Sequence, residues 1–91
     1  MLNQVVLVGR TVRIMPDKEK VKLAIQRTHK NDEGIYETDF FNVKLPGHVV
    51  TSLEYIKIGD MIGIKGRLEG GDRGKVEVIA EKVTFLSTGK N

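Results

Sequence analysis

Residues 20–28 (KVKLAIQRT) and residues 37–45 (ETDFFNVKL) alternate between apolar and polar side chains. This period of two predicts β-strands that turn one face toward a core. Residues 29–34 (HKNDEG), which join them, are polar and end in a glycine, a composition typical of turns. The three stretches together predict a β-hairpin with an extended, charged loop.

Further elements are predicted on both sides of this hairpin. Residues 2–10 (LNQVVLVGR) are rich in valine and leucine and favour a strand that is apolar on both faces. Residues 48–56 carry Val49, Leu53 and Ile56 at helical spacing, which predicts a short helix. Residues 61–68 and 75–86 return to the strand period, the latter with a change of phase that suggests a bulge or cover on both sides.

The predicted order is therefore three strands, one short helix and two strands. This is the order of the OB-fold, an all-β, five-stranded Greek-key barrel with a helix between strands three and four. On pattern alone, an SH3-like or another small β-barrel remains open. A length of 91 residues leaves room for one core. We expect residues 1–86 to form that domain and residues 87–91 a short polar tail.

The composition excludes several classes of protein. The chain has no cysteine, so it forms no disulfide and no thiolate metal site. Its longest apolar run, residues 5–8, is far shorter than the roughly 20 residues that span a membrane. The first residues also lack the basic start and apolar centre of a signal peptide. We therefore expect a cytoplasmic protein with no membrane partner.

The sequence predicts neither catalysis nor a cofactor. His29 and His48 lack the spacing of a metal site. The glycines of residues 70–74 lack the Gly-Lys-Ser/Thr ending of a phosphate-binding loop. Acidic side chains mostly lie beside basic ones, as they do on solvated faces. We expect a binding protein without a metal or cofactor, and not an enzyme.

The strongest binding signal lies on the polar face of the predicted hairpin. On its second strand that face consists of Thr38, Phe40, Asn42 and Lys44, whereas Phe41, Val43 and Leu45 point toward the expected core. An aromatic ring among polar neighbours, beside a cation, is what binders of single-stranded nucleic acid use to stack a base and hold a phosphate. The competing interpretation is that Phe40 fills a subunit interface or packs under the hairpin loop.

Side chains on neighbouring segments extend this candidate surface. Lys20 and Lys22 lie on the same face of the first hairpin strand, with Gln26 and Thr28. Further candidates bracket the two turns: Arg27, His29, Tyr36, Arg67 and Arg73. Each candidate also has an ordinary explanation as a solvated surface side chain or, for Tyr36, as packing under the loop. The net charge of +3 is too small to decide between these explanations.

Five blocks in order resemble bacterial single-stranded DNA-binding proteins. They are residues 1–10 (MLNQVVLVGR), 23–27 (LAIQR), 38–43 (TDFFNV), 59–68 (GDMIGIKGRL) and the last strand up to residues 85 and 86. The resemblance implies an OB-fold that binds single strands in DNA replication, recombination and repair. It also implies assembly through the first strand as a homodimer or homotetramer, which agrees with the two apolar faces of residues 2–10, the second of them formed by Val6 and Val8.

The resemblance assigns roles to individual residues. Phe40 falls where the family has a base-stacking aromatic, and His29 falls where it often has a second. Arg13 lies in a segment similar to the family's Arg-Tyr…Pro stretch, although Ile14 stands in the place of the tyrosine. The predicted DNA-binding set is Phe40, Lys44, Lys22, Lys20, Arg27, Tyr36, His29, Asn42, Arg13, Arg67 and Arg73.

Two departures from the family pattern leave alternatives open. The turn between the last two strands is short, and the acidic tip that recruits replication and repair proteins is missing after Leu86. These features resemble primosomal replication protein N, a tail-less relative with a partner protein in replication restart. A third interpretation is an OB-fold that serves only as a protein-interaction module. The expected ligand is single-stranded DNA, with single-stranded RNA as the alternative.

Overall fold

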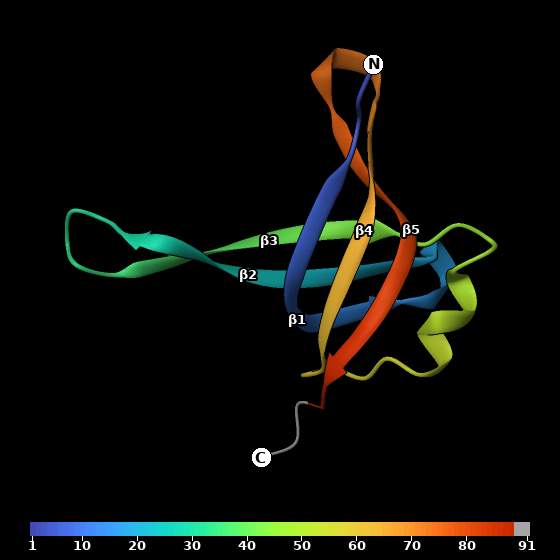
Figure 1. The fold of residues 1–91 in the computed structure, drawn as a ribbon, viewed down its shortest axis with the longest axis horizontal. Helices are drawn as coiled ribbons and strands as arrows, with labels where there is room; N and C mark the ends of the chain where they lie inside the picture. Colours follow the sequence, from blue (N-terminus) through green and yellow to red (C-terminus); the bar gives the residue numbers. More distant parts are fainter. Residues whose placement is uncertain (89–91) are drawn as a thin grey trace.

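Residues 1–88 are described in a computed structural model, where they form five strands closed into a barrel (Figure 1). The strands are β1 (Val5–Met15), β2 (Lys20–Lys30), β3 (Tyr36–Lys44), β4 (Met61–Gly70) and β5 (Val76–Ser87). Their order around the barrel is β1-β2-β3-β5-β4. Strands β3 and β5 pair in parallel, and the other neighbours pair antiparallel. The predicted five-stranded OB-fold is confirmed.

Strand β1 is longer than predicted because it serves two partners in succession. Its first half pairs with β4, from Val5 to Arg10, and its second half pairs with β2, up to Met15. Gly9 lies where β1 crosses closely over β2: a Cβ atom there would lie 2.7 Å from the Ile25 side chain. Only a glycine allows the backbones to approach in this way. After β1, a single 3-10 turn, η1 (Pro16–Lys18), leads into β2.

The predicted helix between β3 and β4 is shorter than expected and is a 3-10 helix, η2 (Val50–Glu54). Consecutive β-branched residues, from Val49 to Thr51, disfavour a longer α-helix, and brief connectors often adopt the tighter 3-10 form. The predicted apolar stripe still has its packing role, since Val49 and Ile56 are buried in the barrel core. The predicted short helix between strands three and four is therefore present, as a 3-10 helix of five residues.

The core consists of the inward-facing residues of the strands. The side chains of β2 to β5 in the buried core cluster are Val21, Leu23, Val43, Ile62, Ile64, Val78 and Ala80, with Leu45 just after β3. Phe41 was expected among them but is 38% exposed. It lies at the point where β3 leaves the barrel together with β2, so the core covers only part of its ring. The predicted alternation of inward and outward side chains along β3 was correct, but the barrel core ends before β3 does.

A β-bulge explains the change of phase in β5. Lys65 pairs with Lys82, and Gly66 pairs with Ala80, so Glu81 is an extra residue on β5. The backbones are very close at this point, because a Cβ atom on Gly66 would overlap the Ile79 carbonyl oxygen. The bulge bends β5 and lets β4 and β5 continue past the barrel.

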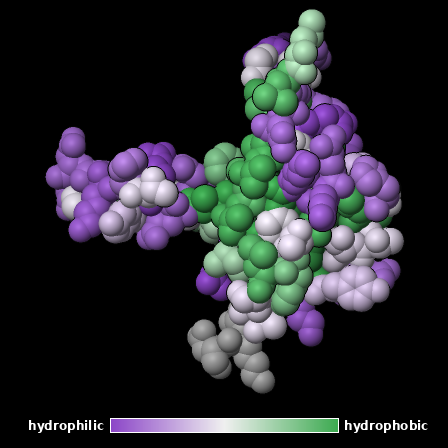
Figure 2. All heavy atoms as spheres, in the orientation of Figure 1, coloured by the Kyte–Doolittle hydropathy of each residue, from purple (hydrophilic) through white to green (hydrophobic). Residues whose placement is uncertain are grey.

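Two hairpins project from the barrel, and Figure 1 shows them as separate arms. The β2–β3 arm carries the loop around Gly34, and the β4–β5 arm carries a short turn with the 3-10 segment η3 (Asp72–Gly74). The surface of the β2–β3 arm is mainly hydrophilic, whereas apolar side chains gather on the barrel between the arms (Figure 2). Ser87, assigned to the polar tail from sequence, is the last residue of β5; the remainder of that tail beyond Thr88 lies outside the described residues.

Candidate nucleic-acid interface

Four cross-strand pairs build one outer surface on β2 and β3. The pairs are Lys20 with Lys44, Lys22 with Asn42, Ala24 with Phe40, and Gln26 with Thr38. Residues directly opposite each other in an antiparallel pair share a face. We call these eight residues the Phe40 face. The ring of Phe40 is 60% exposed on it and does not pack under the hairpin loop.

Strand β1 widens the Phe40 face by a third row of side chains. Arg13 lies opposite Lys22, and Arg10 lies opposite Ala24. Arg13 therefore adds a cation beside the Lys22 and Asn42 pair, where the sequence resemblance placed it. Arg10 was missed by sequence reasoning, although it directly follows the glycine of the VGR motif. Its guanidinium Nη1 donates a 2.7 Å hydrogen bond to the Gly59 carbonyl.

The other aromatic candidates lie on the β2–β3 arm beyond the barrel. Tyr36 follows the same alternation as Phe40, and the ammonium of Lys30 lies 5.5 Å from the centre of its ring. His29 is exposed in a bulge, where residues 27–29 of β2 face the single residue Glu37 of β3. The bulge borders a hollow of about 500 Å³ that His29 helps to line.

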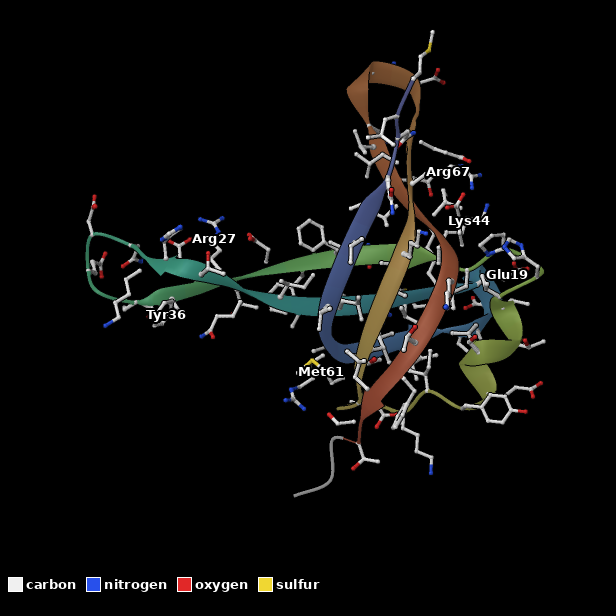
Figure 3. The ribbon with its side chains drawn as sticks, viewed as in Figure 1. Glu19, Arg27, Tyr36, Lys44, Met61 and Arg67 are labelled. Atoms are coloured by element: carbon white, nitrogen blue, oxygen red, sulfur yellow. The ribbon has the colours of Figure 1, made fainter. Side chains whose placement is uncertain are left out.

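Arg27 lies on the opposite side of this arm. Its guanidinium donates from Nε and Nη2 to the Asp39 carboxylate at 3.0 and 2.9 Å, and Nη1 lies 3.2 Å from Glu37. The hydrogen bonds raise the pKa of Arg27 and lower the pKa of Asp39. Figure 3 shows Arg27 and Tyr36 projecting from opposite sides of the arm. Two carboxylates therefore offset the charge of Arg27, and it faces away from Phe40.

Arg67 is held in a similar way on the β4–β5 arm. Its Nη2 lies 2.6 Å from a Glu69 carboxylate oxygen, and its Nη1 lies 3.4 Å from Glu81. The hydrogen bond with Glu69 is the main reason that the pKa of Arg67 is raised. Sequence reasoning could not anticipate this pairing, because Glu81 is the bulge residue of β5.

Arg73 lies in the turn of the β4–β5 arm, which reaches back toward the Phe40 face. The residue adopts a left-handed conformation with φ 61° and ψ 31°. A groove of about 910 Å³ runs between the turn and the face, lined by Lys20, Asn42, Arg73, Lys75, Val76 and Glu77 among others. Lys20 forms an exposed ion pair with Glu77 at 3.6 Å across this groove. The short turn therefore still borders the surface that carries Phe40.

The proposed interface residues lie on the first half of β1. Val6 and Val8 are 66% and 52% exposed and point away from the core. They lie opposite Lys65 and Gly63 of β4, and β2 pairs with β1 only from Arg10 onward. Among residues 1–88 of one copy, no strand lies beside the edge of β1 that faces away from β4 over residues 5–9.

The described residues form neither a metal site nor a membrane-spanning helix. Within residues 1–88, no group of three or more histidine, aspartate or glutamate side chains is placed to hold a metal ion. No helix in the same part of the chain is long and apolar enough to cross a membrane.

The chain is similar to several known single-stranded DNA-binding proteins. No family model matches the chain. The single-stranded DNA-binding protein of Oceanobacillus iheyensis is 36% identical over 97% of this chain and 65% of its own length. Single-stranded DNA-binding protein 2 of Listeria monocytogenes is 36% identical over the whole chain and 68% of its own length. The chain belongs to the single-stranded DNA-binding protein family.

This family member spans about two thirds of the length of these bacterial relatives. Its fold also matches the Plasmodium falciparum SSB solved in complex with ssDNA, with a TM-score of 0.69 over 96% of each chain. At 18% identity, the similarity to this solved structure shows a shared fold and nothing more. The resemblance predicted from five sequence blocks is confirmed. The names of these relatives state single-stranded DNA binding and neither of the two alternative functions.

Proposed function

We propose that this protein binds single-stranded DNA with little sequence preference, in replication, recombination and repair. The observation that carries the proposal is the exposed ring of Phe40 at the centre of a cationic barrel face. Every base has an aromatic face, so stacking on a phenylalanine tolerates any sequence and contributes on the order of 1–3 kcal/mol per base. The names of the bacterial relatives support the same function.

The backbone of the strand would follow the cations around Phe40. Lys22, Lys44 and Arg13 form no ion pair with other residues of the range 1–88, so their charge is available for phosphates. Lys20 and Arg73 continue this track into the groove beside the β4–β5 turn. Asn42 adds an amide next to Lys22, and Tyr36 and His29 offer further rings on the arm.

Arg27 and Arg67 contribute less to DNA binding than the cations around Phe40. Both are already bound by two carboxylates, so a phosphate must compete with those partners. We propose that they mainly hold the two arms in shape. Their contribution to DNA affinity is then indirect, through the position of the arms.

Assembly forms a further part of the proposal. Exposed valines beside an unpaired strand edge are unfavourable in a monomer, because they leave apolar surface and backbone groups open to water. A second copy that docks along Val6 and Val8 would cover both, giving a homodimer or, with a second interface, a homotetramer. We also propose that the protein is located in the cytoplasm, on the nucleoid. Replication or restart proteins are its further proposed partners.

The function is tested by titrating labelled oligo-dT, duplex DNA and single-stranded RNA at low and moderate salt. We expect a preference for single strands, and we expect Phe40→Ala to weaken oligo-dT binding by roughly tenfold through the lost stack. Tyr55→Ala is the matched control, because Tyr55 is 75% exposed at the end of η2, away from the Phe40 face. Equal affinities of both variants would refute the stacking mechanism, and no binding at low salt would refute the function.

A further inference from the structure

The groove beside the β4–β5 turn contains a carboxylate whose charge opposes the binding of DNA. Glu77 lines this groove together with Lys20, Arg73 and Lys75, three cations that suit phosphates. Its side chain is 53% exposed, so packing in the core does not require it. A negative charge on a surface that attracts phosphates lowers the affinity of that surface for DNA. The proposed function alone therefore does not explain why position 77 is a glutamate.

Glu77 directly contacts one of these cations. Its Oε2 lies 3.6 Å from the Nζ of Lys20. The ion pairs of Arg27 and Arg67 each lie within one hairpin, whereas the pair of Lys20 and Glu77 joins β2 to β5 across the groove. Lys20 also stands opposite Lys44 at the end of the Phe40 face. Glu77 thus holds the cation at which that face continues into the groove.

A second carboxylate favours this contact in the protein without DNA. Glu69 of β4 stands directly opposite Glu77 of β5. Like charges at directly opposite positions of two strands repel each other. Glu69 is bound by Arg67 at 2.6 Å and so is held in place beside Glu77. Repulsion from Glu69 and attraction by Lys20 therefore act in the same direction on the Glu77 carboxylate.

We propose that Glu77 competes with a DNA phosphate for Lys20 and thereby speeds the release of the strand. A carboxylate and a phosphate are both anions whose oxygens accept hydrogen bonds from an ammonium group. When a phosphate approaches Lys20, the exposed side chain of Glu77 turns into solvent. When the phosphate moves away, the carboxylate takes its place and hinders its return. This inference rests on the proposed function and adds to it a residue that sets how long DNA stays bound.

The exposure of the ion pair limits the size of the effect. The side chains of Lys20 and Glu77 are 32% and 53% exposed, and an ion pair in contact with water changes an equilibrium constant by about fivefold at most. Glu77→Gln keeps the shape of the side chain and removes its charge. We therefore expect this variant to bind oligo-dT about threefold to fivefold more tightly at low salt, through slower dissociation.

The experiment measures the dissociation rate of fluorescent oligo-dT in stopped flow, after the complex is mixed with excess unlabelled strand, and the affinity at equilibrium. Glu77→Gln is compared with the natural protein and, in a second pair, Lys20→Gln is compared with the double variant. Lys20→Gln removes the cation for which the two anions compete. Adding Glu77→Gln to it should therefore change the rate and the affinity by less than roughly twofold, as expected when two residues act through one contact.

Two further variants show whether the position of the charge matters. Asp72 lines the same groove but forms no ion pair with the residues of the range 1–88. Asp72→Asn makes the same change in charge, and we expect it to slow dissociation by less than roughly twofold, since only long-range attraction changes. Glu54→Gln, at an exposed position on η2, is the distant control and should behave like the natural protein.

The outcomes separate this inference from the function on which it rests. If Phe40→Ala weakens binding but Glu77→Gln leaves the dissociation rate unchanged or raises it, Glu77 does not compete with phosphate while the function stands. If Asp72→Asn slows dissociation as much as Glu77→Gln, or if Glu77→Gln keeps its full effect beside Lys20→Gln, the effect is one of total charge and the inference is wrong. If oligo-dT does not bind the natural protein at low salt, the proposed function itself fails.

Discussion

Arg27 and Asp39 form a two-pronged ion pair on the side of the β2–β3 arm that faces away from Phe40, with N–O distances of 3.0 and 2.9 Å. A guanidinium that binds a carboxylate through two parallel hydrogen bonds is held in one orientation. Glu37, 3.2 Å from the same guanidinium, adds a second negative charge. The pair therefore ties the two strands of the arm together just where the bulge interrupts their ladder.

The Arg27–Asp39 ion pair makes the stability of the fold depend on pH in the acid range. Because Arg27 lowers the pKa of Asp39 in the folded protein, the pair stabilises the fold above the ordinary pKa of 3.8. We expect this stability to be lost as the pH falls below that value and Asp39 becomes protonated. Melting temperatures measured by circular dichroism from pH 6 to pH 2 should therefore fall less steeply in Asp39→Asn than in the natural protein. Asp32→Asn, in the loop of the same arm, serves as the control and should follow the natural curve.

The cations of the Phe40 face predict a measurable dependence on salt. Each phosphate contact of a single strand contributes about −0.7 to the slope of log affinity against log salt concentration. Replacing Lys22 and Lys44 together by glutamine should reduce the magnitude of that slope by roughly 1.4. The change is measured by fluorescence titration of oligo-dT between 20 mM and 300 mM NaCl. Lys57→Gln, on the loop before β4, should leave the slope unchanged, and an unchanged slope in the double variant would remove these lysines from the DNA path.

The close approach of the paired strands β4 and β5 at the bulge predicts a strict need for glycine at position 66. A methyl group there would overlap the Ile79 carbonyl oxygen, so the strands would have to separate. Gly66→Ala is expected to lower the free energy of unfolding by about 3 kcal/mol or to prevent folding, as severe overpacking does. Gly70→Ala is the matched control on the same strand, because a Cβ atom there meets nothing within 4 Å. Urea denaturation of both variants measures the difference, and equal midpoints would contradict the prediction.

The outward valines of β1 predict the oligomeric state. Replacing Val6 and Val8 by lysine should convert an oligomer into a monomer in sedimentation velocity, because the like charges of two copies would then face each other. Val76→Lys is the control, since this valine is similarly exposed but lies at the start of β5. A natural protein that sediments only as a monomer at micromolar concentration would end the assembly proposal.

Strand positions and faces were accessible from the sequence, whereas contacts between strands were not. The alternation around Phe40 placed Lys20, Lys22, Asn42 and Lys44 on its face because a period of two needs no knowledge of tertiary structure. The contacts of Arg27 with Asp39 and of Arg67 with Glu81 involve two bulges, and bulges change which residues meet. Arg10 was missed for a similar reason: its place opposite Ala24 depends on the register of the β1–β2 pair, which shifts between Thr11 and Arg13.

The division of β1 between two partners also bears on how the chain folds. The second half of β1 finds β2 within a few residues, so that hairpin forms early, while β4 begins only at Met61. Closure of the barrel must wait for contacts between distant parts of the chain, and such folds form slowly. During that time the first half of β1 exposes an apolar strand with two open edges, which makes self-association a hazard before the native fold is reached. The valine-rich segment proposed to join mature subunits is thus also the one that a newly made chain must keep from pairing too soon.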